Sequence, residues 1–142
     1  MREASSTALR IRPAGGRLAI QFDVVLVDRP GELGKLARTL AEKAVNIDAI
    51  SAVSGGGKGY VSLLIPAAPK ARTVLREHGY EFGERTVLTV TLEDRPGTLG
   101  ELAKRLGGAG VNVTSVITLN SGSGRVQLAI GVDDLDKARR VV

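Results

Sequence analysis

The sequence predicts an α+β protein in which two similar βαββαβ repeats follow one another, and three observations lead to this prediction. A segment in the first half, Asp28-Arg29-Pro30-Gly31-Glu32-Leu33-Gly34, returns 66 residues later as Asp94-Arg95-Pro96-Gly97-Thr98-Leu99-Gly100. Before each copy, apolar residues occupy every second position, as in a strand with one buried face. After each copy, apolar residues recur at helical spacing. A duplication within a chain of 142 residues predicts two small domains.

The elements of the first repeat follow from its local pattern. A strand at 22–26 leads into a helix whose first turn contains Pro30, because the N–H that proline lacks has no helical partner there. The β-branched run 47–53 and the strand after it are joined by Ser54-Gly55-Gly56-Gly57, which predicts a hairpin. We expect a second helix at about 69–78 and a last strand at 80–84.

The second repeat has the same order but ends near its second helix, at about 134–142. It therefore lacks a last strand of its own, and we expect the alternating segment Thr7–Arg12 to complete its sheet. The order βαββαβ predicts the ferredoxin-like fold, an antiparallel sheet with both helices on one face. The predicted organisation is an N-terminal segment 1–16, a first domain 17–84 and a second domain 85–142.

Composition excludes several classes of function. The chain has no Cys and one His, so disulfides, thiolate metal sites, cysteine nucleophiles and multi-histidine sites are excluded. We expect no metal, no cofactor and, without a nucleophile–base pair, no catalytic residues. No apolar run approaches the roughly 18–20 residues of a membrane span, and residues 1–16 lack the apolar core of a secretory signal. We therefore expect a cytoplasmic protein without membrane contact.

The repeated motif itself predicts a site for a small ligand. A helix that begins at Pro30-Gly31 presents free N–H groups and the positive end of its dipole, which suit a carboxylate. A glycine lets a ligand approach the backbone, an aspartate can pair with an ammonium group, and an asparagine offers both donor and acceptor. These groups occur twice, at Asp28, Gly31 and Asn46 and again at Asp94, Gly97 and Asn112. Together they suit a free amino acid.

The strand, the Asp-Arg-Pro-Gly-x-Leu-Gly segment, the amphipathic helix and the Val-Asn-Ile or Val-Asn-Val segment after it resemble the ACT domain over nearly the whole chain. ACT domains are regulatory modules of amino-acid biosynthesis enzymes. The resemblance implies an amino acid held between two domains, with the loop before the helix on one side and the Asn segment on the other. Carried over residue by residue, the ligand-binding positions are Asp28, Gly31, Glu32, Leu33, Asn46 and Ile47, and Asp94, Gly97, Thr98, Leu99, Asn112 and Val113.

The resemblance implies a non-catalytic sensor that forms a homodimer and acts on a separate enzyme subunit. Serine is not supported as its ligand, because Asp28 stands where the serine-binding version has Asn and Leu26 where it has His. One alternative is a structural or dimerisation scaffold without ligand, in which Asp28 and Asp94 cap helices and the asparagines satisfy loop backbone. The other alternative is an RNA-binding module of the same plan, suggested by Lys58-Gly59-Tyr60. Two Phe and two Tyr leave little for base stacking, and the net charge of +5 is spread along the chain, so nucleic-acid binding is not expected.

Overall fold

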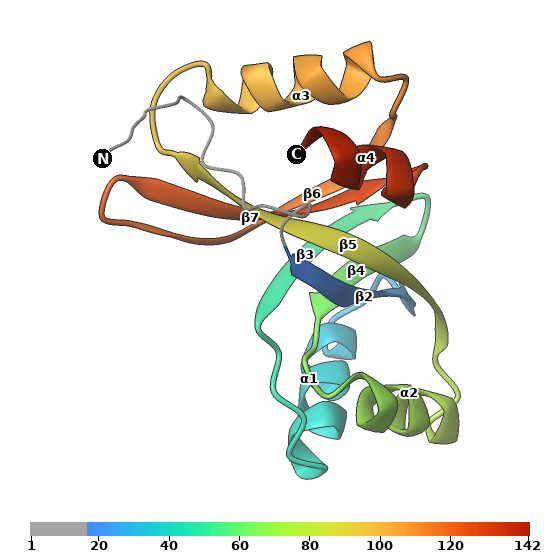
Figure 1. Cartoon of the computed structure of the whole chain (residues 1–142). Coiled ribbons are helices and arrows are strands. Elements are labelled where there is room, and N and C mark those ends of the chain that lie inside the picture. Colours follow the sequence, from blue (N-terminus) through green and yellow to red (C-terminus); the bar gives the residue numbers. More distant parts are fainter. Residues whose placement is uncertain (1–16) are drawn as a thin grey trace. The chain divides into compact units, whose positions relative to one another are not determined.

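The computed structural model describes residues 17–142, an α+β arrangement in which antiparallel strands carry four helices within this range (Figure 1). The predicted class, α+β with antiparallel strands, is confirmed. The described chain divides into two compact units. The first unit comprises residues 20–85, and the second unit comprises residues 86–142 together with 17–19.

The first unit contains the first copy of the motif. Its elements are β2 (Arg17–Val27), α1 (Glu32–Glu42), β3 (Ala49–Gly55), β4 (Lys58–Leu64), α2 (Ala68–Glu77) and the start of β5 (Glu81–Glu93). Strand β4 lies between β2 and β3 and pairs antiparallel with both. The two helices bury their apolar stripes against one face of these strands, where the largest buried side chains are Phe22, Leu36, Leu40, Leu63 and Leu75.

The second unit contains the second copy. Its elements are the rest of β5, α3 (Thr98–Gly108), β6 (Val113–Gly122), β7 (Arg125–Val132) and α4 (Leu135–Val141). Strand β7 lies between β5 and β6 and pairs antiparallel with both. The pairing of β6 with β7 shifts register twice, between Val113 and Ser115 and between Thr118 and Asn120. The core is formed by apolar residues that include Leu88, Leu92, Leu102, Leu106 and Leu128.

The predicted first turn of the helices is wrong in one respect. Pro30 and Pro96 are not helical residues, since α1 begins at Glu32 and α3 at Thr98. The N-cap residues are the glycines that follow the prolines, and their φ angles are +91° at Gly31 and +96° at Gly97. This left-handed backbone costs an L-residue with a side chain roughly 1–2 kcal/mol, so the motif requires glycine there.

The last strand expected at 80–84 is present from Glu81 onward, but it does not end at Glu84. Strand β5 runs without a break from Glu81 to Glu93, through the predicted domain boundary at residues 84 and 85. Between these ends the chain has no Pro, Asn or Asp to start a turn, so the backbone stays extended. The strand expected at Thr7–Arg12 lies outside the described residues. Between residues 17 and 142, no helix has the length and apolar character needed to cross a membrane.

Candidate functional site

The loop between β2 and α1 folds back against the β3–β4 hairpin. The N–H of Asp28 donates to the carbonyl of Gly57 in the hairpin turn (3.2 Å), and the N–H of Arg29 donates to the carbonyl of Val27 (3.0 Å). The second unit repeats this arrangement, with the N–H of Asp94 on the carbonyl of Gly124 (2.9 Å). The repeated motif therefore gives one loop conformation in both units.

The first turn of α1 presents unsatisfied donors. Its N-cap, Gly31, supplies no side chain, and no side chain caps the helix. Among the described residues, the amides of Leu33 and Gly34 make no hydrogen bond, whereas the amide of Lys35 donates to the carbonyl of Gly31 (2.9 Å). Asp28 is therefore not a helix cap, which removes the structural role considered for it from the sequence. The free amides and the dipole make this helix start attractive to an anion.

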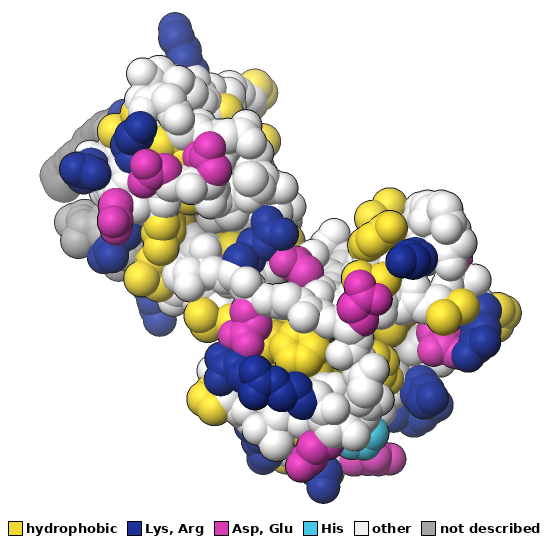
Figure 2. All heavy atoms as spheres, turned by 90° about the vertical axis from the view of Figure 1, so that its right-hand side faces the viewer, with side chains coloured by type: hydrophobic (Ala, Val, Ile, Leu, Met, Phe, Trp, Pro, Cys, Tyr) yellow, Lys and Arg dark blue, Asp and Glu magenta, His cyan; other side chains and the backbone are white. Residues whose placement is uncertain are grey.

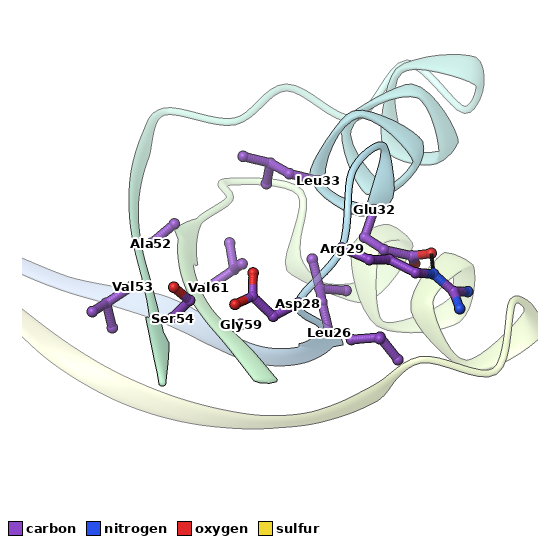
Figure 3. A pocket seen from close by; sticks show the side chains of 11 residues that line it. Leu26, Asp28, Arg29, Glu32, Leu33, Ala52, Val53, Ser54, Gly59 and Val61 are labelled. Atoms are coloured by element: carbon purple, nitrogen blue, oxygen red, sulfur yellow. Dashed lines mark hydrogen bonds and ion pairs between the residues drawn. The ribbon is translucent and has the colours of Figure 1, made fainter. Parts of the chain in front are cut away.

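A pocket of about 150 Å³ opens beside this loop, within the first unit (Figure 3). Its apolar walls include Leu26, Leu33, Ala52 and Val61, which come from β2, α1, β3 and β4. The carboxylate of Asp28 stands in the middle of this group, and Leu33 lies on its α1 side (Figure 3). The pocket thus combines a carboxylate, apolar walls and the start of a helix.

The charges around the pocket are unevenly paired. Arg29 and Glu32 form an ion pair (Nε to Oε2, 2.7 Å), and this pair points away from Asp28 in Figure 3. The Asp28 carboxylate has no hydrogen-bond partner among residues 17–142. The hydroxyl-bearing side chain of Ser54, from the end of β3, also lines the pocket. Asp28 is therefore available to accept hydrogen bonds from a cationic group of a ligand.

The predicted site residues of the first repeat divide into two groups. Asp28, Glu32 and Leu33 line the pocket, and Gly31 forms the adjoining N-cap. Asn46 and Ile47 do not line it: the Asn46 amide donates to the carboxylate of Asp48 (2.9 Å), and Ile47 packs on the core. They precede β3 at the end opposite Ser54, and the strand from Ala49 to Ser54 alone spans roughly 17 Å. One unit by itself does not bring the two groups together.

Sequence reasoning missed the contribution of the hairpin to this pocket. Ala52 is paired with Val61 and Ser54 with Gly59, so these residues share the face of the sheet that the helices cover. The sequence placed Ser54 in the turn, whereas β3 extends through Gly55. The apolar alternation of β4 was the signal for Val61, but the register that adds Ser54 depends on the length of the turn.

The predicted residues of the second unit have different surroundings. Thr98 is only 4% exposed, and its hydroxyl donates to the carbonyls of Glu93 (2.8 Å) and Arg95 (3.2 Å). The backbone N–H of Asn112 donates to the carboxylate of Asp133 (2.9 Å), so this asparagine position joins the end of β7. Of the other predicted positions, Asp94 and Gly97 keep the loop conformation, Leu99 is half exposed, and Val113 packs on the core.

A second pocket, of about 320 Å³, lies in the second unit, and none of the predicted residues lines it. Its lining is polar and comes from β5, β6, β7 and the turn between the last two, including Thr91, Asn120, Arg125 and Gln127. Within residues 17–142, no three His, Asp or Glu side chains are placed to hold a metal ion.

Comparison with known proteins identifies a family for the second half of the chain and solved structures with a similar fold. Residues 86–140 match the family model of the ACT domain. Among solved structures, the chain is similar to BT0572 from Bacteroides thetaiotaomicron, with a TM-score of 0.80 and 19% identity over 87% of this chain and 85% of that one. It is also similar to the ligand-free regulatory subunit of aspartate kinase from Thermus thermophilus, with a TM-score of 0.63 and 18% identity over 90% and 95% of the two chains. The corresponding subunit from Thermus flavus gives a TM-score of 0.66 and 18% identity over 92% and 96%.

At these identities the solved structures establish the shared fold. The search of curated proteins gave no significant match. The family match covers β5 from residue 86, the whole of α3, β6 and β7, and most of α4. The chain therefore carries an ACT domain over residues 86–140.

Proposed function

We propose that the chain is a non-catalytic regulatory protein of two tandem ACT domains that binds a free amino acid between ACT domains and transmits its presence to a separate enzyme subunit. The observation that carries this proposal is the pocket at the β2–α1 loop, where an unpaired carboxylate, free helix amides and apolar walls converge. The first unit has the motif and loop geometry of the unit that matches the ACT family, which supports reading both as ACT domains of the ferredoxin-like fold.

Each group of an amino acid has a counterpart in this pocket. Asp28 accepts hydrogen bonds from the α-ammonium group, and the amides of Leu33 and Gly34 donate to the α-carboxylate. The ligand side chain packs on Leu26 and Val61. The pocket has a volume of about 150 Å³, which suits a small ligand.

The asparagine half of the predicted site has to come from another domain, because Asn46 lies at the far end of β3. Among the described strands, β3 has one partner, β4, and its other edge is open. From Ala49 to Gly55 this edge has no charge, no proline and no register shift, the features that usually protect an edge from pairing. In our proposal a second copy pairs antiparallel along β3, which places its Asn46 beside the Asp28 loop.

This arrangement provides a mechanism for signalling. A ligand that contacts Asp28 of one copy and Asn46 of the other binds the dimer better than the separate chains. It therefore shifts the population toward the dimer by its difference in affinity for the two states. That the solved regulatory subunits of aspartate kinase share this fold supports a separate enzyme as the partner.

A thermal-shift screen of the full chain against the twenty proteinogenic amino acids tests the proposal. We expect a selective rise in Tm, since a ligand at 100 times its Kd stabilises the folded state by about 2.7 kcal/mol. Asp28→Asn should reduce the shift by about half or more, because a hydrogen bond to a charged group is lost, whereas Asp136→Asn, at an exposed position on α4, should keep it. A flat screen with the native chain would favour the scaffold without ligand.

RNA binding is not the function that the structure favours. Tyr60 is 48% exposed on β4, but Val53, its partner across the sheet, and Val27 are aliphatic and offer no stacking surface. On the face shown in Figure 2, Lys and Arg side chains are interspersed with Asp and Glu. A nucleic-acid interface usually gathers its basic residues into one patch.

A further inference from the structure

We infer that Gly59 receives the side chain of the ligand and limits its size, so that the amino acid bound beside Asp28 has a branched aliphatic side chain, as valine, leucine and isoleucine do. This inference rests on the proposed function. Three observations carry it: the place of Gly59 in the sheet, its ordinary backbone conformation, and the residue that the second unit has at the same place.

Gly59 forms the floor of the pocket. It lies in β4, opposite Leu26 of β2 and opposite Ser54 of β3, on the face of the sheet that the helices cover (Figure 3). Neighbouring strands are about 4.8 Å apart, so the two flanking strands are separated by roughly 10 Å. Between the side chains of Leu26 and Ser54 there is consequently a hollow whose floor is backbone.

The backbone at Gly59 does not require a glycine. Its φ lies outside the left-handed range, and the pairing of β4 with β2 and β3 has no register shift. A Cβ at this position would lie 3.8 Å from the Cβ of Leu26 and 4.0 Å from its carbonyl oxygen, which are ordinary contact distances. Glycine within a strand lowers stability, and where no bulge or bend explains it, it marks a close approach of another molecule to the backbone.

The second unit shows that the fold accepts a branched side chain at this place. There Val126 of β7 occupies the same row of the sheet, opposite Leu92 and Ser121, and it packs against the core. The two rows are equivalent because Leu92 is the counterpart of Leu26 in the repeated sequence. The space above Gly59 is therefore the space that a valine side chain fills in the other unit.

The lining of this hollow favours an aliphatic group. The walls next to it include the side chains of Leu26 and Val61. Of the charged residues that line the pocket, Arg29 and Glu32 pair with each other, and Asp28 binds the α-ammonium group in the proposed function. No charged partner is left for the side chain of the ligand, so a charged side chain would be buried at a cost, whereas an aliphatic one gains from burial.

Isothermal titration calorimetry of the full chain, with each of the twenty proteinogenic amino acids as the probe, tests the inference. We expect the native chain to bind valine, leucine or isoleucine at least tenfold more tightly than glycine or lysine, because each buried methylene contributes about tenfold or more. Gly59→Val should weaken the binding of these branched amino acids by about tenfold or more, since its own side chain occupies their space. Gly83→Val is the matched control. It adds the same side chain to β5 outside the pocket, where a Cβ meets no atom within 4 Å, and should leave the affinity unchanged.

The melting temperature without ligand separates this role from a structural one. Gly59→Val should leave it unchanged or raise it, and a lower value would show that the fold needs the glycine and would overturn the inference. Native-like affinity in Gly59→Val, or a native chain that prefers any other class of amino acid, would also overturn the inference and leave the proposed function standing. A native chain that binds none of the twenty amino acids would contradict the proposed function, and the inference with it.

Discussion

Replacing Thr98 with valine removes a buried hydroxyl while it keeps the shape of the side chain. The hydroxyl donates to the carbonyl of Glu93 at 2.8 Å and to that of Arg95 at 3.2 Å. Both carbonyls keep a hydrogen bond in the variant. The carbonyl of Glu93 still accepts from the N–H of Arg95 (3.0 Å), and the carbonyl of Arg95 still accepts from the N–H of Thr98 (3.4 Å). The loss is therefore one net hydrogen bond, about 1 kcal/mol, or about 3–5 °C in Tm for a chain of this size.

Urea unfolding followed by circular dichroism measures this loss, with Glu32→Gln as the matched variant of the first unit. That change breaks an ion pair whose arginine side chain is 64% exposed, so it should cost well under 1 kcal/mol. We expect Thr98→Val to be the more destabilising of the two. If both variants unfold at the same urea concentration as the native chain, the Thr98 hydroxyl does not stabilise the β5–α3 loop.

Three further changes test other parts of the structure. Leu40→Ala should lower the free energy of unfolding by about 2–5 kcal/mol, because the side chain is fully buried in the core of the first unit. Leu33→Ala, at a position that is 44% exposed, should lower it far less. Equal losses in urea unfolding would contradict the assigned core. Gly31→Ala should destabilise the fold by about 1–2 kcal/mol because its φ angle is positive. A Cβ at this position meets no atom within 4 Å, so the backbone conformation is the cause of the loss. An unchanged midpoint of urea unfolding would argue against the left-handed N-cap. The hydrogen bond from Arg72 lowers the pKa of Glu84. The ion pair therefore stabilises the fold fully above the ordinary glutamate pKa, and this stabilisation disappears as the pH falls through the lowered pKa of Glu84. Glu84→Gln should remove this pH dependence, and an unchanged loss of stability at acidic pH in the variant would refute the pairing.

Local pattern predicted the helices and hairpins because burial of one face imposes a period on the sequence. The start of α1 was misplaced because a proline fits both the first helical position and the position before a glycine N-cap, and composition alone does not separate the two. The continuity of β5 was missed because the alternation at Tyr80–Glu84 resembles the end of one repeat. Whether an extended segment stops at Glu84 or continues depends on which strands pair with it, and local pattern does not contain this information.

The part of the candidate site that the repeated motif forms could be predicted from the sequence. Asp28, Glu32 and Leu33 come together at the pocket because a tight loop carries them from β2 to α1. Ser54 and Val61 were not predicted as site residues, because hairpin register decides which of two alternating sets faces the helices. The register shift at Leu119 was not predicted for the same reason, because the local sequence pattern does not show which residue of a strand lacks a partner in the neighbouring strand.

The two units show that the repeated motif encodes one backbone conformation. Gly31 and Gly97 have the same left-handed N-cap, and both loops bond to their hairpin turns. The variable position of the motif is Glu32 in one copy, where it pairs with Arg29, and Thr98 in the other, where its hydroxyl donates to the carbonyls of Glu93 and Arg95.

The family match and the proposed ligand pocket fall in different halves of the chain. A family match responds to the scaffold, which the second unit keeps in full over residues 86–140. The register shift in β6 turns Asn120 to the opposite face of the sheet and places Ser121, which lies opposite Val126, on the face that the helices cover. Leu26 and Val61 belong both to the core of the first unit and to the wall of the pocket, so the fold and the proposed site share residues, and a substitution at either position should change stability and ligand binding together.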